Sequence, residues 1–468
     1  MKDKRIIAFL LLLIIFVIAF ILYRWSLKAY FFQDDWFSLI ISNVNSLQDF
    51  LHLFAPRRDV IYYRPLGMQI PFFISSYIFG LNSIPLHLFS FIIHAFNIYL
   101  VFLLSLRLTK KDSVSLISAF FFATSSIHFI PFFWSSTISF PLGLMFFLLT
   151  FILFLDWHKT KKPKLFFLML TTQILSLVTN ELALTFPLIA FFYMHIFSKI
   201  NYRLFIIISI FPALYVILRI LYLPKLTQTY TLAFGKPTLY AAASYFLWLF
   251  NWPEEIKHQL ENLRAGYTTF FSSFPVQNIL LLLFSLTFIF LIFRFFQNIY
   301  AQKSEKKKLA IFFLCIIISG LVFPLLFPLH IYPYYLLVSL VGLSYLLSFS
   351  IIHFKPIYLA AIIIFWILGS YITINFQNRS HWAYQRSQIS RLLVNDMLSR
   401  YPTIKKSQKV HIENVSYKIV LSDQNAFKVL YNKDIQTIYY GKESNIWDNN
   451  IDKDVSLQKE RFKWNYVN

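Results

Sequence analysis

The sequence predicts an all-α polytopic membrane protein that ends in a small α/β domain. Of its 468 residues, 58% are hydrophobic and only 14% are charged, a composition outside the usual range of soluble globular domains. The apolar residues form continuous runs, and a run of about 20 such residues can cross the hydrocarbon core of a bilayer. The runs stop after residue 375. We therefore expect a membrane domain over 1–375 and a second domain over 376–468.

Eleven apolar runs are candidate membrane spans. The first, 5–25, follows the basic start MKDKR and has no small-residue cleavage site, so we expect a retained helix rather than a removed signal peptide. The other ten candidate spans lie at 84–106, 113–131, 136–155, 164–179, 181–198, 203–222, 276–294, 309–328, 333–352 and 356–375.

Basic residues divide the connections between these spans into two groups. Because Lys and Arg accumulate in cytoplasmic loops, the division predicts a multi-pass protein of the cell membrane with a cytoplasmic N-terminus and an extracytoplasmic C-terminal domain. The net charge of +22 suits anionic lipid headgroups, so membrane lipids rather than nucleic acid are the expected partners. The basic segments on the N-terminal side are 107–112, 156–164, 198–203, 294–308 and 353–356.

Two long segments are expected on the outer side. Residues 26–66 carry an aspartate pair. Residues 223–275 carry the charged stretch PEEIKHQLENLR and the run TLYAAASYFLWLFNW (238–252), which is short for a twelfth span and is expected to form an interfacial helix.

The C-terminal region predicts mixed secondary structure. RSQISRLLVNDMLSRY has the pattern of an amphipathic helix, and KVHIENV, YKIVLS, AFKVLY and IQTIYYG have the pattern of short strands. The single cysteine, Cys315, lies in an apolar run, so neither an intramolecular disulfide nor a cysteine-based metal site is expected.

Three carboxylates are predicted to share the outer face. Asp34 and Asp35 directly follow the first span, and two adjacent carboxylates are difficult to keep charged at a membrane surface, which favours a chemical role. Glu181 begins the sixth span. Acids near hydrocarbon are functional candidates, although a carboxylate at a helix N-terminus is also favoured by the helix dipole.

Cationic side chains accompany these acids. Arg57, Arg58 and Arg64 lie in the first outer segment, and Arg219 lies about one turn before the outer end of the seventh span. A guanidinium group suits bidentate binding of phosphate at headgroup depth. The alternative for Arg219 is a side chain that reaches the interface without binding a ligand.

Three polar residues form a stripe along the second span. His87, His94 and Asn97 are spaced by seven and three residues, so they lie on one helical face that must contact other helices or water. For His94 we expect a packed, hydrogen-bonded side chain. His87 lies nearer the outer surface and is a candidate for lining a cavity.

Six features follow one another along the chain: DDWFSLI (34–40), YYRPL (62–66), FGLNSIPLHLFSFIIHAFNIYLVFLL (79–104), FATSSIHFIPFFWSS (122–136), TNELALTFP (179–187) and Trp382. In this order they resemble the GT-C glycosyltransferases, in particular the protein O-mannosyltransferase-like branch that includes the cadherin-directed O-mannosyltransferases and bacterial relatives. The resemblance is good over roughly 26–200 and looser beyond.

The resemblance implies a GT-C-like fold and an inverting transferase. Such an enzyme takes a sugar from a polyprenyl-phosphate donor and moves it to a hydroxyl of a protein or an envelope glycan or lipid at the outer face. The resemblance implies that Asp34 or Asp35 supplies the base and that Glu181 is also a catalytic residue. It implies no particular cofactor. A divalent metal at the Asp pair is left open. The donor-binding candidates are Tyr63, Arg64, His87, Arg219, His330 and Tyr334, and the acceptor-side candidates are His128 and Trp134.

The chain departs from the family pattern at three positions. Ile130 replaces a glutamate, Asn180 replaces a lysine, and Pro333 stands where an arginine is usual. Two alternatives therefore stay open. One is a transporter or flippase of lipid-linked glycans, although no internal repeat supports it. The other is a non-catalytic relative that binds an envelope partner. The Asp pair and Glu181 argue against this alternative, and Ile130 keeps it open.

Overall fold

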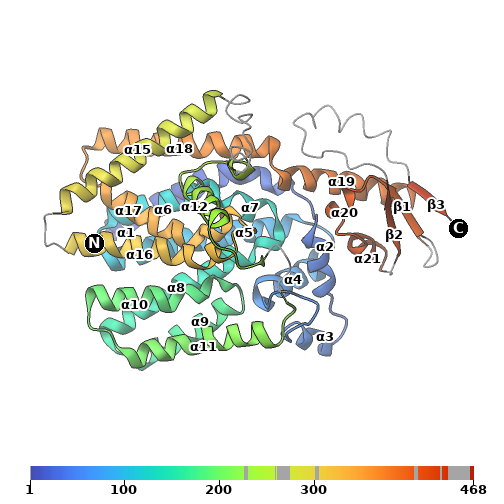
Figure 1. Ribbon diagram of the computed structural model, residues 1–468, viewed down its shortest axis with the longest axis horizontal. Coiled ribbons are helices and arrows are strands. Elements are labelled where there is room, and N and C mark those ends of the chain that lie inside the picture. The colour runs from blue at the N-terminus through green and yellow to red at the C-terminus, as the bar shows by residue number, and fades with distance from the viewer. Residues whose placement is uncertain are drawn as a thin grey trace.

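The computed structural model describes residues 2–225, 230–258, 260, 275–300, 305–404, 409–432, 435–440 and 464–467. Parts of the predicted outer segment 223–275 and of the basic segment 294–308 lie outside this described part. Most of the described chain forms a bundle of helices that run along one common direction (Figure 1). The N-terminus lies at one end of the bundle, and the C-terminal strands lie at the other end.

Long apolar helices make up the bundle. They are α1 (Lys2–Tyr23), α5 (Ile84–Thr109), α8 (Ser139–Thr160), α11 (Tyr202–Leu221), α15 (Pro275–Tyr300), α16 (Glu305–Leu326), α17 (Leu337–Ile351) and α18 (Pro356–Ser380). Shorter elements join or extend them: η1 (Arg24–Lys28), α6 (Asp112–Thr124), η3 (Ser126–His128), α7 (Phe129–Phe133), η4 (Ser135–Thr137), α9 (Pro163–Leu177), η5 (Glu181–Thr185), α10 (Phe186–Phe197) and η7 (Pro333–Leu336).

Each of the eleven predicted spans falls on helix, but fewer meet the length of a full span. Within the described residues, eight helices are long and apolar enough to cross a membrane. A ninth candidate is the pair α6 and η3–α7, which bends by 45° because Ser125 adopts an extended conformation between the two parts. The helices α9 and η5–α10 are shorter apolar helices. The chain is therefore a polytopic membrane protein, and the number eleven stays a prediction.

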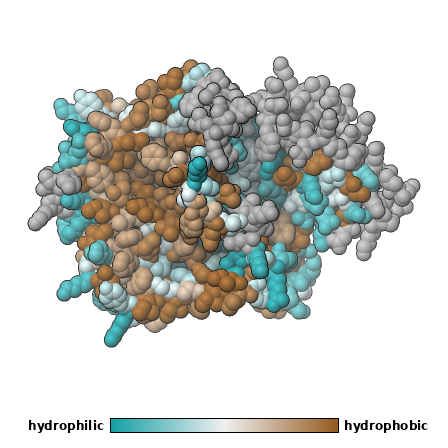
Figure 2. Space-filling view, viewed as in Figure 1, coloured by the Kyte–Doolittle hydropathy of each residue, from teal (hydrophilic) through white to brown (hydrophobic). Residues whose placement is uncertain are grey.

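The surface of the bundle matches this membrane assignment. Figure 2 shows a broad apolar area over the helices, with hydrophilic residues towards the two ends of the molecule. Leu10 of α1, Leu214 of α11 and Leu283 of α15 are among the large apolar side chains that the bundle exposes. Exposed apolar area of this extent is rare on soluble monomers and is normal where lipid covers the surface.

The interior is packed mainly with aromatic and aliphatic side chains. Helix α17 lies in the centre, and every residue from Leu337 to Ile351 is buried. Trp366 of α18 is fully buried against Phe121, Phe284 and Phe288, at ring-centroid distances of 4.8, 5.4 and 5.1 Å. Aromatic pairs at such distances add to the energy of area burial.

Short elements cover the end of the bundle that is remote from the N-terminus (Figure 1). They are α2 (Asp34–Ile41), α3 (Leu47–His52), the π-helical turn η2 (Pro65–Gln69) and α4 (Ile70–Phe79), whereas α12 (Lys236–Leu249) lies over the middle of the bundle in this view. Helix α12 confirms the helix predicted at 238–252, and it buries Tyr245 and Trp248. Its interfacial position stays a prediction.

The C-terminal region begins with the predicted amphipathic helix, α19 (Trp382–Arg400). Strands β1 (Lys409–Glu413), β2 (Thr437–Tyr440) and β3 (Trp464–Val467) form a sheet in the order β2-β1-β3, in which β1 pairs parallel to β2 and antiparallel to β3. Strands β1 and β2 lie in the predicted strand segments KVHIENV and IQTIYYG.

Two of the predicted strands are wrong. YKIVLS contains helix α20 (Tyr417–Val420), and AFKVLY lies in helix α21 (Asn425–Tyr431). Short apolar runs fit either period, so neighbouring contacts decide between them. Helix α21 packs against α2 and ends at Asn432, whose left-handed conformation (φ +50°) is a common helix end.

The C-terminal region shares its core with the segments before α5. Trp36 of α2 and Phe72 of α4 belong to the same buried apolar cluster as Leu393 of α19 and Phe427 of α21. Helix α18 continues across residue 375 to Ser380. The sequence-based division into two domains stays a prediction, and the described contacts join the two parts closely.

Candidate functional site

A cavity of about 340 Å³ lies at the end of the bundle that carries α2, α4 and the end of α11. Most of its walls are apolar side chains, including Phe140, Phe323 and Phe327. Its charged and ring-bearing polar residues are Tyr62, Arg64, Glu181, Tyr215, Arg219, Tyr230, His330 and Tyr335. A largely apolar pocket with a few convergent polar groups is the usual form of a small-ligand site.

An ion pair between Arg64 and Glu181 stands in the cavity wall. Nη2 and Nε of Arg64 lie 2.6 and 2.7 Å from Oε2 of Glu181, and the two side chains are 16% and 30% exposed. The hydroxyl of Tyr215 donates to Oε1 of Glu181 at 2.9 Å. Burial opposes the charge of Arg64, but Glu181 outweighs burial and raises the pKa of the guanidinium. The pair is therefore a stable charged feature that remains open to the cavity.

A close backbone approach brings these two residues together. Gly67 of η2 has no room for a Cβ atom because the carbonyl of Thr179 and the side chain of Ser139 lie against it. The N–H of Leu66 donates to the carbonyl of Val178 at 3.3 Å. A larger residue at position 67 would push η2 away from η5, so this glycine allows Arg64 to reach Glu181.

Arg219 and His330 face the cavity from other elements. Nη1 of Arg219 donates to the carbonyl of Pro224 at 2.7 Å, and its buried Nη2 has no acceptor in the described part of the chain. His330 packs its ring 4.1 Å from the ring of Tyr230. Burial, with the charges of Lys257 and Arg64, lowers the pKa of His330 to about 4, so this imidazole is neutral at pH 7. Arg219 thus lines the cavity, and its Nη2 group is a donor without an acceptor among the described residues.

Asp34 lies beside this cavity without lining it. Its side chain is accessible to solvent, yet protein surrounds it on most sides, and this burial raises the pKa of Asp34 to about 6 against the opposing charge of Arg386. No described donor forms a hydrogen bond with its carboxylate. The charge of Asp34 adds to burial in raising the pKa of Tyr62, which lines the cavity, so the two groups lie within electrostatic range.

Asp35 has a different environment from its neighbour. It is 1% exposed, and its carboxylate accepts bonds from the N–H and Oγ of Ser136 at 2.7 and 2.6 Å and from the N–H of Phe32 at 3.2 Å. Burial raises the pKa of Asp35 to about 7 although these bonds oppose the shift. Asp35 joins α2 to η4, and this bonding leaves Asp34 as the open carboxylate of the pair.

The residue before the pair has an unusual backbone conformation. Gln33 adopts φ +50° and ψ −124°, a region that glycine favours and that costs other residues about 1–3 kcal/mol. Its N–H donates to the carbonyl of Val420 at 2.8 Å, and its side-chain carbonyl accepts a bond from Arg386. Two C-terminal residues therefore hold the turn that leads into Asp34.

A second charged cluster lies close by but is closed. Glu254 is 1% exposed, and its carboxylate lies 2.5 Å from Nζ of Lys257 and 2.7 Å from Nε2 of His381. The indole N–H of Trp382 donates to the same carboxylate at 3.2 Å. Burial alone would raise the pKa of Glu254, but Lys257 and His381 hold it at about 2. This cluster fixes the start of α19 against the segment after α12.

Two predicted donor-binding tyrosines lie beside the cavity without lining it. The carbonyl of Tyr63 accepts a bond from Tyr215 at 3.3 Å, and its hydroxyl donates to the carbonyl of Phe54 at 2.8 Å. Tyr334 is buried, with its ring 4.5 Å from that of Phe140. Both residues support the cavity wall.

The remaining predicted site residues lie in the core. Nδ1 of His87 lies 2.8 Å from the carbonyl of Phe132, and Nε2 of His128 lies 2.8 Å from the carbonyl of Phe122. Both histidines are buried, and neither lines the cavity. Trp134 is also buried, 5.3 Å from the ring of Trp382, which places it between η4 and α19 rather than in the cavity.

The histidine expected to pack does so. Nε2 of His94 lies 3.1 Å from the carbonyl of Ala123, and the amide of Asn97 donates to the carbonyl of Pro141 at 2.8 Å. Both residues are buried. The polar stripe of α5 therefore holds α6 and α8 in place.

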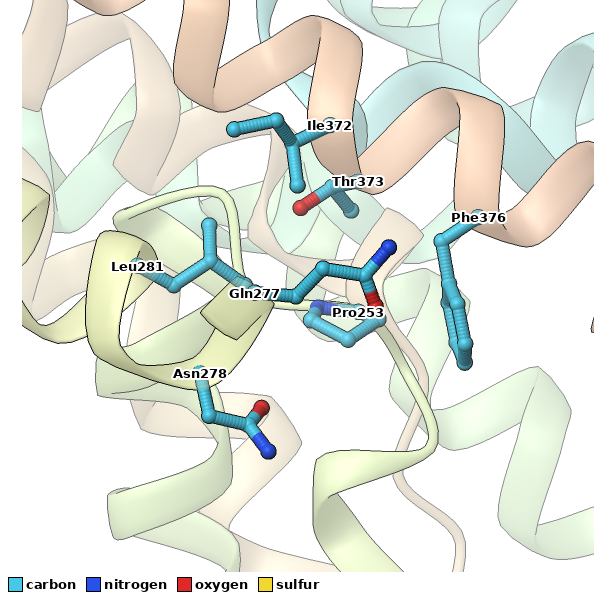
Figure 3. Close-up of a pocket in the computed structure, with 7 residues that line it drawn as sticks. All are labelled: Pro253, Gln277, Asn278, Leu281, Ile372, Thr373 and Phe376. Atoms are coloured by element: carbon cyan, nitrogen blue, oxygen red, sulfur yellow. The ribbon is translucent and has the colours of Figure 1, made fainter. Parts of the chain in front are cut away.

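A small gap between α15 and α18 is not a second ligand site. Figure 3 shows Gln277, Asn278, Thr373 and Phe376 around it, together with Pro253. Its volume is about 10 Å³, which is room for about one water molecule. In the described part of the chain, no group of three or more His, Cys, Asp or Glu side chains is placed to hold a metal ion. A metal at the Asp pair stays a prediction.

Several residues of the site were not predicted from the sequence. Tyr62 and Tyr215 stand beside residues that were singled out, but tyrosine is common in this chain and gives no distinct signal. Glu254 and Lys257 lie in the stretch PEEIKHQLENLR, which was recognised only as charged. Arg386 lies on the polar face of an amphipathic helix, where a cation is ordinary.

No protein-family model matches the chain, and no curated protein is similar to it. The class that fold and site define is therefore a polytopic membrane protein with a partly apolar, arginine-bearing cavity beside an accessible aspartate.

Proposed function

We propose that this protein is a membrane glycosyltransferase that moves a sugar from a polyprenyl-phosphate donor to an acceptor hydroxyl at the outer membrane face. One observation carries the proposal. Asp34 is an accessible carboxylate with no hydrogen-bond donor among the described residues, and it lies beside a cavity that combines apolar walls with Arg64 and Arg219. This combination supplies a base, a phosphate site and a lipid-compatible surface at one place.

The charges of the cavity favour a singly charged donor. Glu181 neutralises Arg64, and Glu254 neutralises the neighbouring Lys257, while His330 is neutral. Among the described residues that line the cavity, Arg219 then supplies the positive charge that no acid compensates. A sugar phosphodiester carries one negative charge, so a polyprenyl-monophosphate sugar fits this balance.

Asp34 acts as the general base in this mechanism. Its carboxylate takes the proton of the acceptor hydroxyl while that oxygen attacks the anomeric carbon of the sugar. The bond between the anomeric carbon and the phosphate oxygen breaks, and the electron pair leaves with the polyprenyl phosphate. Attack from the face opposite the leaving group inverts the anomeric configuration. A pKa of about 6 leaves Asp34 mostly ionised at neutral pH and still able to accept a proton.

The cations act on the leaving group. The phosphate gains a second negative charge when the bond breaks, and the guanidinium of Arg219, which lines the cavity, would bind it. Arg64 also lines the cavity, where its aromatic contacts with Tyr62 and Phe140, at 4.9 and 5.0 Å, hold the guanidinium in place. The acceptor is a protein or an envelope glycan or lipid.

The orientation is part of the proposal. We place the N-terminus in the cytoplasm, and the cavity and residues 376–468 outside, because the basic connections fall on the N-terminal side. In a Cys315-free background, a cysteine at position 430 is expected to react with an impermeant reagent from outside, and one at position 306 is not. The reverse pattern would place the site on the wrong face for an extracytoplasmic acceptor.

Donor binding tests the proposal without any acceptor. The purified protein in nanodiscs is titrated with a polyprenyl-phosphate mannose, a polyprenyl-phosphate glucose and the corresponding free polyprenol. We expect a phosphate sugar to bind best. Arg219→Ala should lower its affinity roughly tenfold to a hundredfold, since a hydrogen bond to a charged group contributes about 1.5–3 kcal/mol.

Arg107→Ala is the matched control for that titration, because Arg107 pairs with Asp156 at 2.8 Å on α5 and α8, away from the cavity. Its donor affinity should equal that of the parent. Equal affinity of the parent for polyprenol and for both phosphate sugars would contradict the proposed donor class.

A further inference from the structure

The segment that leads into Asp34 is held by the C-terminal helix α19. Oγ of Ser387 accepts a bond from the N–H of Tyr30 at 2.8 Å, and the side chain of Gln388 donates to the carbonyl of Lys28 at 3.1 Å. These contacts join residues more than 350 positions apart in the chain. Helix α19 therefore holds the segment that precedes α2, and we call this set of contacts the brace.

Arg386 occupies the critical position of this brace. It donates to the side-chain carbonyl of Gln33, the residue with φ +50°, and its guanidinium stacks 5.0 Å over the ring of Trp382. Trp382 is in turn bonded to the buried Glu254. The closed cluster around Glu254 thus fixes Trp382, Trp382 supports Arg386, and Arg386 reaches the strained turn.

Arg386 also acts on Asp34 through its charge. Among the groups around Asp34, it is the one whose positive charge opposes the effect of burial. Its side chain bonds to Gln33, the residue before Asp34, while its charge acts on the Asp34 carboxylate.

The other titratable groups near Asp34 do not replace this charge. Arg64 precedes η2 and is paired with Glu181, and Lys428 of α21 and Tyr77 of α4 are exposed. Element η4 carries no charged residue. Among the described residues, the groups that interact electrostatically with Asp34, besides Arg386, are Asp35, Tyr62, Tyr230 and Tyr332, all neutral or negative.

We propose that Arg386 is a positioning residue for the reaction: from α19 it holds Gln33 in its strained conformation and so fixes the backbone that places Asp34 beside the cavity. The C-terminal region is then part of the active site rather than a separate attachment. This inference rests on the proposed function for its catalytic part, whereas the brace itself is a property of the folded protein.

The brace is measured first, without substrate. Hydrogen exchange of the full-length protein in nanodiscs reports on the peptide 28–36, in which the amides of Tyr30 and Gln33 bond to the C-terminal region. Arg386→Gln should speed exchange of this peptide roughly tenfold, as expected for the loss of one charge-assisted bond. Exchange at the parental rate would overturn the brace.

Arg391→Gln is the matched control. Arg391 lies on the same helix, and its guanidinium stacks 5.7 Å over the ring of Tyr30. The substitution removes the same charge, but Arg391 does not act on the ionisation of Asp34. Exchange in the peptide 28–36 should change at most slightly. An effect as large as that of Arg386→Gln would show that any cation on α19 suffices and would overturn the specific role of Arg386.

The second measurement is the pH profile of transfer. Without Arg386 the pKa of Asp34 rises, so the base is ionised only at higher pH, and the acidic limb of kcat/KM should move up by about one pH unit in Arg386→Gln. Arg386→Lys should restore most of the parental limb because it keeps the charge. If the acidic limb of the kcat/KM profile stays at the parental pH in Arg386→Gln, the catalytic part of the Arg386 proposal is wrong.

A further variant tests the bond between Gln33 and Arg386 in a protein that is expected to remain folded. Gln33→Gly removes the acceptor of Arg386 but suits φ +50°, so the protein should remain folded while exchange of the peptide 28–36 speeds up. Parental exchange in this variant would overturn the link between Gln33 and Arg386. If the parent transfers no sugar from any polyprenyl-phosphate donor, the proposed function fails, and the exchange data still decide the brace.

Discussion

Two clusters of acids and cations lie near one another at the same end of this protein, and they differ in access. Around Arg64 and Glu181, charged groups border a cavity and keep part of their surface open. Glu254 and His381, in contrast, are sealed from solvent and bond to each other. Charge content alone therefore does not identify a ligand site. The open cluster is suited to binding, and the closed cluster is suited to holding elements together.

The largest expected effect is on the stability of the fold, and it distinguishes the closed cluster around Glu254 from the open cluster around Arg64. Glu254→Ala leaves His381 and Lys257 without their acid in a buried place, and breaking such a buried pair typically costs about 3–5 kcal/mol. Thermal unfolding in detergent should show a strongly lowered midpoint. Glu305→Ala, which removes the exposed partner of Lys308, is the control and should leave the midpoint unchanged. If Glu254→Ala leaves the unfolding midpoint unchanged, the closed cluster does not stabilise the fold.

The next effect concerns the open cluster. Arg64→Lys keeps the positive charge but loses the planar contacts with Glu181, Tyr62 and Phe140. Donor affinity should fall roughly tenfold, because a lysine is not equivalent at a bidentate, stacked position. The midpoint of unfolding should fall less than in Glu254→Ala. Full donor affinity in Arg64→Lys, measured by titration in nanodiscs, would exclude this arginine from the phosphate site.

The same contrast predicts opposite pH dependences of stability. The pKa of Asp35 rises from 3.8 to about 7 in the folded protein, so its contribution to stability is complete below pH 3.8 and is lost as pH rises towards 7. The pKa of Glu254 falls from 4.5 to about 2, so its contribution is present above pH 4.5 and is lost on acidification.

Unfolding midpoints at pH 5 and pH 8 measure the first of these contributions. The parent should lose stability between the two values, and Asp35→Asn should lose less, because the amide does not ionise. An equal loss in both proteins would show that Asp35 is not the group that titrates in this window.

The smallest expected effect concerns a residue that the sequence placed at the donor site. His87 lies in the core, bonded to the carbonyl of Phe132, and does not line the cavity. His87→Asn should therefore leave donor affinity within about twofold of the parent, since it removes no donor contact. A loss as large as that expected for Arg64→Lys would show that the cavity extends to α5 when a donor is bound.

The membrane bundle was predictable because lipid imposes a simple pattern. Every apolar run had to be a helix, and the structure confirms helix at each of them. Helix ends were less predictable. The bend at Ser125 depends on how α6 and α7 pack, and the helical state of YKIVLS and AFKVLY depends on contacts with α2 and α19, which a short apolar run does not encode.

The site was predictable only in part. Asp34, Arg64, Glu181 and Arg219 stand out because charges near apolar runs are rare, and three of them do border one cavity. Arg386 and the bond between Glu254 and His381 join segments more than 100 residues apart. Local sequence patterns do not predict such long-range pairs, so only the three-dimensional structure identifies them.

The central claim is that the open carboxylate, Asp34, does the chemistry while the bonded Asp35 supports it. Asp34→Asn keeps the shape and removes the base, so the decisive measurement is sugar transfer from the bound polyprenyl-phosphate donor in reconstituted vesicles, with donor affinity measured on the same sample. We predict unchanged affinity and a loss of transfer of about 10²–10⁴-fold. Transfer at the parental rate in Asp34→Asn would contradict the account.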